Sequence, residues 1–204
     1  MRKLALILFV VCTINSVAQQ TANKYVYTLQ DAYKYANDVT NIEVVGQEVE
    51  DLKSDVVFPK LISIDLSSNL LTSFPEQIFS SPLLKNLNLG TNQLEFLPKK
   101  IDVLVNLEKL NLEKNNLASI PDEIGNLKNL QTLGLFENQL SEFPETFDKL
   151  TNLRELEIGK NALRKFPENL EHLKFIEVFN ITQNEFDSIP PTIGALQNLK
   201  IFVA

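Results

Sequence analysis

Few side chains in this chain have the chemistry that catalysis needs. Its 204 residues include one histidine, His172, and one cysteine, Cys12. Nucleophilic catalysis requires a base beside a serine or a cysteine. Cys12 lies in an apolar N-terminal run, and His172 adjoins Leu173 where a solvated side chain is expected. No glycine-rich phosphate loop is present. We therefore expect a protein that is not an enzyme, with no catalytic residue and no cofactor.

Residues of the same type recur at a fixed spacing, which indicates an array of one repeated structural unit. Seven apolar residues recur every 23 positions. Six of them are followed by an asparagine eight positions later, and each asparagine is followed by a proline after six more positions. Internal periods of this length are typical of solenoids. The sequence therefore predicts an α/β solenoid. The apolar residues stand 23 positions apart, at Leu61, Leu84, Leu107, Leu130, Leu153, Ile176 and Leu199.

Each unit of the array combines a strand with a helical turn. In the unit that begins at Leu84, Leu87 and Leu89 alternate with Asn88 as in a strand. Ile101 and Leu104 are spaced by three, as in one turn of helix or 3₁₀ structure. No single unit can bury its apolar residues, so we expect the units to stack on one another.

The recurring asparagines have a structural explanation. Where the chain turns after each strand, backbone groups lose their partners, and a side-chain amide can bond to several of them. Leaving such buried groups unpaired would cost about 1–3 kcal/mol each. We therefore predict a structural asparagine ladder, with no catalytic role, formed by Asn69, Asn92, Asn115, Asn138, Asn161 and Asn184.

The unit from Leu84, LxxLxLxxNxLxxLPxxIxxL, resembles the leucine-rich repeat in its 23-residue form, as found in exported bacterial proteins. The resemblance covers Leu61 to the C-terminus. It implies a curved right-handed superhelix with a concave parallel sheet of about eight strands and a convex side of short helical or 3₁₀ turns and extended segments. It also implies a non-enzymatic scaffold that binds a protein or glycan ligand on the concave face.

We expect four parts along the chain. They are a signal peptide at 1–18, a linker and capping helix at 19–38, a degenerate first repeat at 39–60, and six full repeats plus a partial last one at 61–204. The helix is expected from the capping box Thr28-Leu29-Gln30-Asp31. The first repeat is degenerate because Gln47 and Lys53 replace the asparagine and the proline.

The N-terminus predicts export. Two basic residues precede the apolar run Leu4–Ile14 and the small-residue triplet Ser16-Val17-Ala18. This run is too short to span a bilayer. A lipoprotein is not expected, because Val11 and not a small residue precedes Cys12. We expect a secreted, periplasmic or cell-surface protein without disulfides.

Residues between the inward apolar positions are predicted to form the concave surface. Phe136 is the one large aromatic residue there, and nothing in the repeat demands it. An exposed aromatic ringed by charges is typical of a binding hot spot, although isolated exposed apolar residues are common. The candidate ligand-binding residues are Asn88, Asn111, Glu113, Phe136, Glu137, Arg154, Glu157, Lys160 and Asn180.

Two carboxylates, Glu43 and Asp65, are predicted neighbours in the sheet. Such a pair can share a proton or hold a cation. Two solvated acids on a polar face explain the pair more simply. We therefore assign no metal site.

Charge and hydropathy limit the partners. The net charge of −7 argues against nucleic acid, which requires a basic surface, and no later stretch approaches the length of a membrane-spanning helix. Recognition of a protein or glycan is one open function. The other is a structural or adhesion role in the cell envelope, through self-association of the C-terminal strand. There Leu199, Phe202 and Ala204 are expected to face inward and to leave an unpaired edge.

Overall fold

The computed structural model describes residues 24–204, so the predicted signal peptide and the first residues of the predicted linker lie outside the described residues. One parallel sheet runs in chain order from β1 to β9, which confirms the predicted α/β solenoid. The strands are β1 Tyr25–Val26, β2 Asn41–Glu43, β3 Ser63–Asp65, β4 Asn86–Asn88, β5 Lys109–Asn111, β6 Thr132–Gly134, β7 Glu155–Glu157, β8 Val178–Asn180 and β9 Ile201–Val203.

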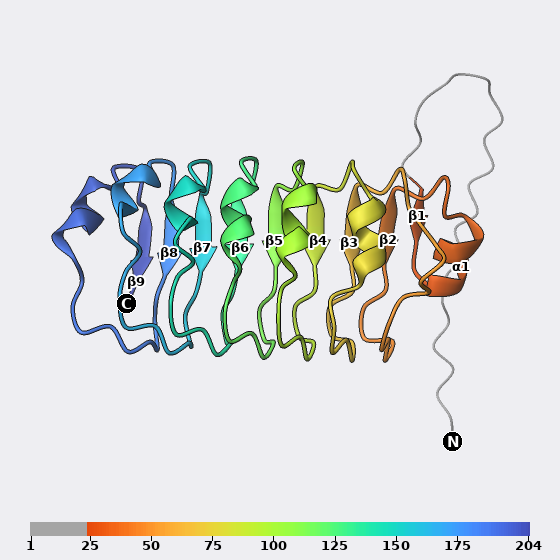
Figure 1. Cartoon of the computed structure of the whole chain (residues 1–204), viewed down its shortest axis with the longest axis horizontal. Coiled ribbons are helices and arrows are strands. Elements are labelled where there is room, and N and C mark those ends of the chain that lie inside the picture. Colours follow the sequence, from red (N-terminus) through yellow and green to blue (C-terminus); the bar gives the residue numbers. More distant parts are fainter. Residues whose placement is uncertain (1–23) are drawn as a thin grey trace.

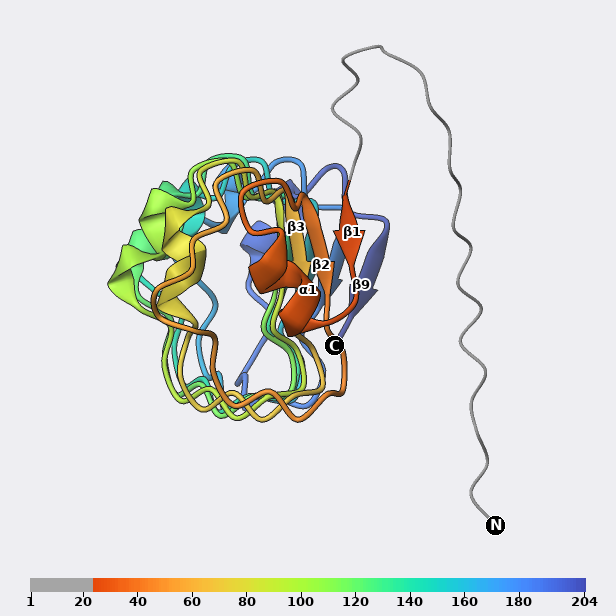
Figure 2. The same cartoon turned by 90° about the vertical axis from the view of Figure 1, so that its right-hand side faces the viewer.

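Short helical elements lie opposite the sheet. Viewed along the solenoid axis, the strands form one side of the molecule and the 3₁₀ turns another (Figure 2). In the perpendicular view the units follow one another in a row from α1 to β9 (Figure 1). Within residues 24–204, no helix is both long and apolar enough to cross a membrane. The elements are the α-helix α1 Leu29–Lys34 and the 3₁₀ turns η1 Glu76–Ser80, η2 Lys99–Val103, η3 Asp122–Asn126, η4 Phe147–Lys149, η5 Leu170–His172 and η6 Pro191–Ala195.

The core runs the length of the array between these two sides. The central residue of a strand faces inward, as Leu87 and Leu110 do with 2% and 0% exposure, because side chains alternate across a strand. From η2 and the residue after it, Ile101 and Leu104 face the same core. Burying such a side chain stabilises the fold by about 1.5–3 kcal/mol. With one cysteine in the whole sequence, packing and not an intrachain disulfide holds the units together.

Each predicted ladder asparagine lies in the turn after a strand and bonds to two repeats. Asn115 is 6% exposed. Its Nδ2 donates to the carbonyl oxygens of Leu89 and Leu112, both at 3.0 Å. Its Oδ1 accepts from the Leu94 N–H at 3.0 Å. The same arrangement recurs at Asn69, Asn92, Asn138, Asn161 and Asn184.

The residue before each ladder asparagine has a left-handed backbone without being glycine. The φ angle is 53° at Lys114, 59° at Glu137 and 57° at Lys160. The Lys114 backbone is held on both sides, because its N–H donates to the Phe136 carbonyl and its own carbonyl accepts from the Asn92 N–H. A left-handed φ costs a non-glycine residue about 1–2 kcal/mol, so bonds between repeats maintain a conformation that the residue alone disfavours.

A second asparagine ladder, which was not part of the sequence prediction, joins the loops before the strands. The Asn106 Nδ2 donates at 2.8 Å to the carbonyl of Pro82 in the preceding repeat. The repeats that begin at Leu61, Leu84 and Ile176 lack this asparagine and carry Lys60, Leu83 and Phe175 there. The ladder continues at Asn129, Asn152 and Asn198.

Helix α1 covers the N-terminal end of the core (Figure 2). Thr28 caps it, since the Thr28 Oγ1 accepts from the Asp31 N–H at 3.1 Å. Ala32 is fully buried, and Tyr33 packs against the core. Strand β1 makes nine strands where about eight were expected. Two residues carry no alternation pattern, so this strand had no signal in the sequence.

The first and last repeats differ from the others. In the first, Gln47 does not bond as the ladder asparagines do, and its Nε2 donates to the Tyr27 carbonyl at 2.8 Å. In the last, Leu199 and Phe202 are partly buried against the core, whereas Ala204 is exposed. The prediction that Ala204 faces inward is wrong, because Ala204 lies beyond the end of β9.

Candidate binding site on the face of the sheet

The solvent-facing side chains of β2–β9 and of the two residues that follow each strand, called the sheet face below, form the surface that the sequence predicts to be concave. A hollow of about 480 Å³ lies on it over β3–β7. In-register parallel pairing gathers its lining, because Asn88, Asn111 and Gly134 are direct neighbours across β4–β6. The lining includes Asp65, Asn88, Lys109, Asn111, Glu113, Thr132, Gly134, Glu155 and Glu157.

Hydrogen bonds fix the polar side chains of the sheet face. The Asn88 Nδ2 donates to the Asp65 Oδ2 at 2.8 Å, and the Asn88 Oδ1 accepts from the Gly90 N–H at 3.1 Å. The Asn111 Oδ1 accepts from the Glu113 N–H at 2.8 Å, and the Asn180 Oδ1 accepts from the N–H two residues later at 3.0 Å. These predicted site asparagines therefore hold their own turns while they line the surface.

Carboxylates dominate the middle of the hollow. Glu113 leans over Gly134, so that a Cβ atom at this glycine would lie 3.0 Å from the Glu113 Oε1. Glu155 and Glu157, at the two ends of β7, line the same hollow. Burial and the negative charges of Glu157 and Glu155 raise the pKa of Glu113, and the nearby Lys114 opposes this shift. The centre of the sheet face is therefore electrostatically negative.

Among the described residues, some carboxylates outside the sheet face are balanced by ion pairs with neighbouring repeats, whereas the carboxylates of the sheet face are not. Glu108, Glu137 and Glu177 each pair with a lysine or arginine of a neighbouring repeat. Among residues 24–204, the carboxylates of the sheet face form no ion pair, and Lys109 is the one cation that lines the hollow. These unpaired carboxylates are Glu43, Asp65, Glu113, Glu155 and Glu157.

Phe136 is less exposed than the sequence suggests. Its side chain is partly buried but does not belong to the core. A Cβ atom at Gly159, in the next repeat, would lie 3.0 Å from the Phe136 Cδ2. The ring therefore occupies the space that this glycine leaves, and it stays at the surface.

The remaining charged candidates lie at the two edges of the sheet. Lys160 pairs with Glu137 in the turns after the strands. Arg154 precedes β7 and pairs with Glu177 at 2.9 Å. Arg154, a candidate ligand-binding residue, therefore lies beside Glu177 and Phe175 and away from Phe136. About 17 Å of extended chain separates Arg154 from Gly159, over which Phe136 lies.

The C-terminal part of the sheet face carries apolar side chains beside the polar Asn180. Ile201 and Val203 flank the inward-facing Phe202 on β9 and are 52% and 42% exposed. Val178, which is partly buried, pairs with Ile201 across β8 and β9. On its other side Val178 pairs with Glu155. The acidic and apolar parts of the face are therefore adjacent.

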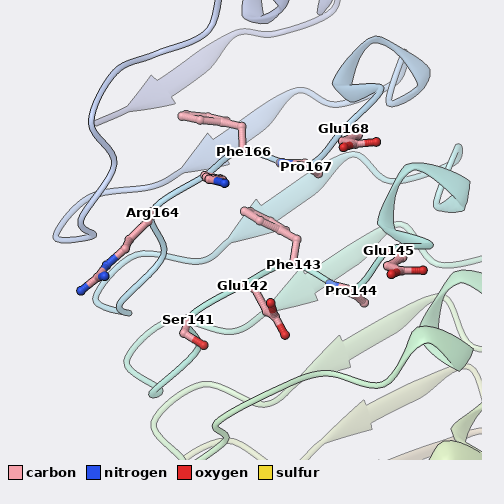
Figure 3. A pocket seen from close by; sticks show the side chains of 10 residues that line it. Ser141, Glu142, Phe143, Pro144, Glu145, Arg164, Phe166, Pro167 and Glu168 are labelled. Carbon is pink, nitrogen blue, oxygen red and sulfur yellow. The ribbon is translucent and has the colours of Figure 1, made fainter.

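A second hollow, of about 800 Å³ and called the Phe143 hollow below, lies between two units. It is formed by the segments that join the asparagine turns to η4 and η5. Phe143 and Phe166 precede the repeat prolines here and point the same way from neighbouring units (Figure 3). The equivalent Phe74 and Leu97 are 3% and 5% exposed, whereas Phe143 and Phe166 are only partly buried. The hollow therefore marks looser packing between these two units.

His172 and Asp65 could take part in catalysis or metal binding, but each interacts with a nearby residue. The exposed His172, on η5, has its Nδ1 3.0 Å from the Asp148 Oδ2. Glu43 and Asp65 are neighbours in the sheet, but the Asp65 Oδ1 accepts from the backbone and the hydroxyl of Ser67. In the described part of the chain, no three His, Cys, Asp or Glu side chains are arranged to hold a metal ion.

Comparison with known proteins identifies the family to which these repeats belong. The family described as Leucine rich repeat matches residues 59–117, 82–140 and 105–163, which together span just over half of the chain. The chain belongs to the leucine-rich-repeat family. A leucine-rich-repeat protein of Leptospira interrogans is 32% identical, with a TM-score of 0.77, over 81% of this chain and 42% of that one.

Two further solved structures resemble this leucine-rich-repeat protein. The Arabidopsis receptor kinase HAESA, in complex with the peptide hormone IDA and the co-receptor SERK1, is 29% identical over 81% of this chain and 30% of that one, with a TM-score of 0.73. An internalin of Listeria monocytogenes shares the fold at 22% identity, over 85% of this chain and 52% of that one, with a TM-score of 0.76. The chain thus spans about half or less of these structures. No curated protein sequence matches significantly.

The sequence-based choice of site residues omitted Glu155, Ile201 and Val203. Glu155 lines the hollow, and the other two form the apolar end of the face. The register carries the signal, because Ile201 stands 23 positions after Val178, as Val178 stands after Glu155.

Proposed function

We propose that this leucine-rich-repeat protein is a non-enzymatic scaffold that binds a protein or peptide through its sheet face, outside the cytoplasm. The hollow over β3–β7 carries the proposal, because hydrogen bonds preform its polar lining and its carboxylates form no ion pair among the described residues. A preformed surface loses little entropy on binding. Proteins of this fold commonly serve as protein-binding scaffolds, and HAESA, solved with a peptide hormone, supports the same use here.

A steric block tests this proposal. Thr132 lines the hollow on β6, and Val103 on η2 is 43% exposed on the opposite side. Peptides selected from a random display library on the purified chain are expected to bind Thr132→Trp at least about tenfold more weakly. They should bind Val103→Trp as they bind the original chain. Selected peptides that all bind Thr132→Trp normally would exclude the sheet face as the binding surface.

The export part of the proposal rests on the N-terminal sequence. Residues 1–18, outside the described residues, have the layout of a signal peptide. Protein isolated from its host is expected in a fraction outside the cytoplasm. Its intact mass should correspond to a chain that begins at Gln19. A full-length chain in the cytoplasmic fraction would contradict export.

Self-association is the second candidate, for a structural or adhesion role. The exposure of the apolar side chains of Ile201 and Val203 on β9 favours it, since exposed apolar patches mark sites of contact between proteins. Sedimentation velocity over a range of concentrations separates the two functions. A monomer supports the binding scaffold alone. Concentration-dependent dimers that Ile201→Lys abolishes would support assembly.

A further inference from the structure

The sheet face changes character along the solenoid, and this gradient suggests what it binds. Over β5–β7 its side chains include Glu113, Glu155 and Glu157. Over β8 and β9 they include Val178, Ile201 and Val203, and the last two are about half exposed. The two parts share rows, because Glu155 pairs with Val178 and Val178 with Ile201.

We propose that the sheet face binds an extended polypeptide segment that places a lysine or arginine over Glu113, Glu155 and Glu157 and an apolar side chain over Ile201 and Val203. This inference rests on the proposed function and specifies its partner. The segment would cross the strands and follow the rows that join β7 to β9.

The charge of the surface selects a basic partner. Some carboxylates elsewhere on the described chain have cations from neighbouring repeats, as Glu177 has Arg154 and Lys200. The carboxylates of the hollow have no such partner within residues 24–204. Mutual repulsion contributes to the raised pKa of Glu113, after burial. A cationic side chain from a ligand would relieve this repulsion and gain attraction in a partly desolvated hollow.

The apolar end makes the surface selective among basic partners. A purely acidic surface would attract any cationic chain and release it at moderate salt. Ile201 and Val203 add apolar area that is already exposed, and covering it stabilises a complex by a hydrophobic contribution that moderate salt does not screen. A partner with both features is therefore favoured over one that is only basic.

The strand spacing fixes the distance between the two features in the partner. From β7 to β9 there are two interstrand steps, or about 10 Å in total at about 4.8 Å each. A segment in the extended polyproline II conformation advances about 3.1 Å per residue and returns to the same face every three residues. The basic and the apolar residue should therefore lie about three positions apart in the partner.

Selection from a random peptide display library on the purified full chain tests this inference. The enriched peptides are expected to share a lysine or arginine with Leu, Ile, Val or Phe about three positions away. Their affinity should fall at least about tenfold for Glu155→Gln/Glu157→Gln and for Val203→Lys. It should change less than about twofold for the matched control Glu142→Gln/Glu145→Gln, which removes two exposed carboxylates from the side of the Phe143 hollow.

The outcomes separate this inference from the proposed function. Peptides that lose binding to Thr132→Trp but show no basic residues, or no sensitivity to Glu155→Gln/Glu157→Gln, overturn the inference and leave the sheet face as the binding surface. Peptides that bind Thr132→Trp normally overturn both. Concentration-dependent dimers abolished by Val203→Lys would make a second copy the occupant and would also overturn the inference. Thermal melting checks each variant, and Ile201→Thr replaces Val203→Lys if the latter fails to fold.

Discussion

At the level of single residues, amide side chains both stabilise the turns and shape the surface. Each ladder asparagine satisfies backbone groups of two repeats, whereas Asn88 and Asn111 hold the turns of the sheet face. The spacing of the ladder asparagines predicted their place in the turns. It could not predict that Phe136 lies over Gly159, because the repeat fixes where a side chain starts and not how it packs against a neighbour that varies.

Asn115→Ala is expected to lower the free energy of unfolding by about 2–4 kcal/mol, because it leaves several buried backbone groups without partners. The matched control is Asn106→Ala in the second ladder, where the side chain is exposed and makes one bond. This variant should lose only about 0.5–1.5 kcal/mol. Urea denaturation followed by circular dichroism measures both. Equal losses would show that burial does not set the strength of the ladder.

Glu113→Gln is expected to stabilise the protein near neutral pH. The folded pKa of Glu113 is raised, first by burial and then by Glu157, so the folded state holds this proton more tightly than the unfolded chain does. The stability from this group is complete below the usual value of 4.5 and is lost as pH rises through the folded pKa. Melting temperatures across this range should show a gain for the variant that disappears in acid. A gain that is constant with pH would contradict the assignment.

Phe136→Ala is expected to weaken binding of selected peptides about tenfold while the melting temperature stays nearly constant. The ring is at the surface and outside the core, so little packing is lost. Phe175→Ala is the control, since Phe175 is also a surface aromatic residue but lies beside Arg154 at the sheet edge. Loss of stability with unchanged binding would assign Phe136 a packing role instead.

At the level of elements, recurring leucines and asparagines determined most of the fold. The strands from β2 to β9 and the 3₁₀ turns after each proline follow from periods that a single sequence displays. Strand β1 and the Phe143 hollow do not. Strand β1 is too short to alternate, and the hollow depends on how two particular units pack. The predicted division into signal peptide, cap and repeats stays a prediction.

Gly125 and Gly194 occupy the same position in η3 and η6, and they should respond differently to alanine. A Cβ atom at Gly125 would overlap the side chain and the carbonyl oxygen of Thr146, whereas nothing lies within 4 Å of one at Gly194. Gly125→Ala is expected to cost about 1–3 kcal/mol of unfolding free energy. Gly194→Ala should be neutral or slightly stabilising. Chemical denaturation compares them, and similar effects would show that η3 and η4 can move apart freely.

At the level of the whole molecule, the described core becomes less buried toward the C-terminus. Helix α1 covers the first repeat, and Ile101, Leu107 and Leu110 are fully buried, while Leu199 and Phe202 are only partly so. In an array whose units contact mainly their neighbours, opening begins where the contacts are fewest.

Amide hydrogen exchange under native conditions is therefore expected to be faster in β8 and β9 than in β4 and β5, by about tenfold or more. The peptides that contain β4 and β5 serve as the internal reference. Uniform protection along the solenoid would mean that the array opens in a single cooperative step.

The left-handed turns before the ladder asparagines give each repeat a dependence on the next. Lys114 keeps its φ of 53° while its N–H and carbonyl bond to Phe136 and Asn92. A unit cut out of the array would lose both partners, and its turn would relax to a right-handed or extended backbone. The shape of a turn is thus shared between neighbours and is not encoded in the segment that forms it. A displacement imposed on one repeat would reach the next through the main chain itself.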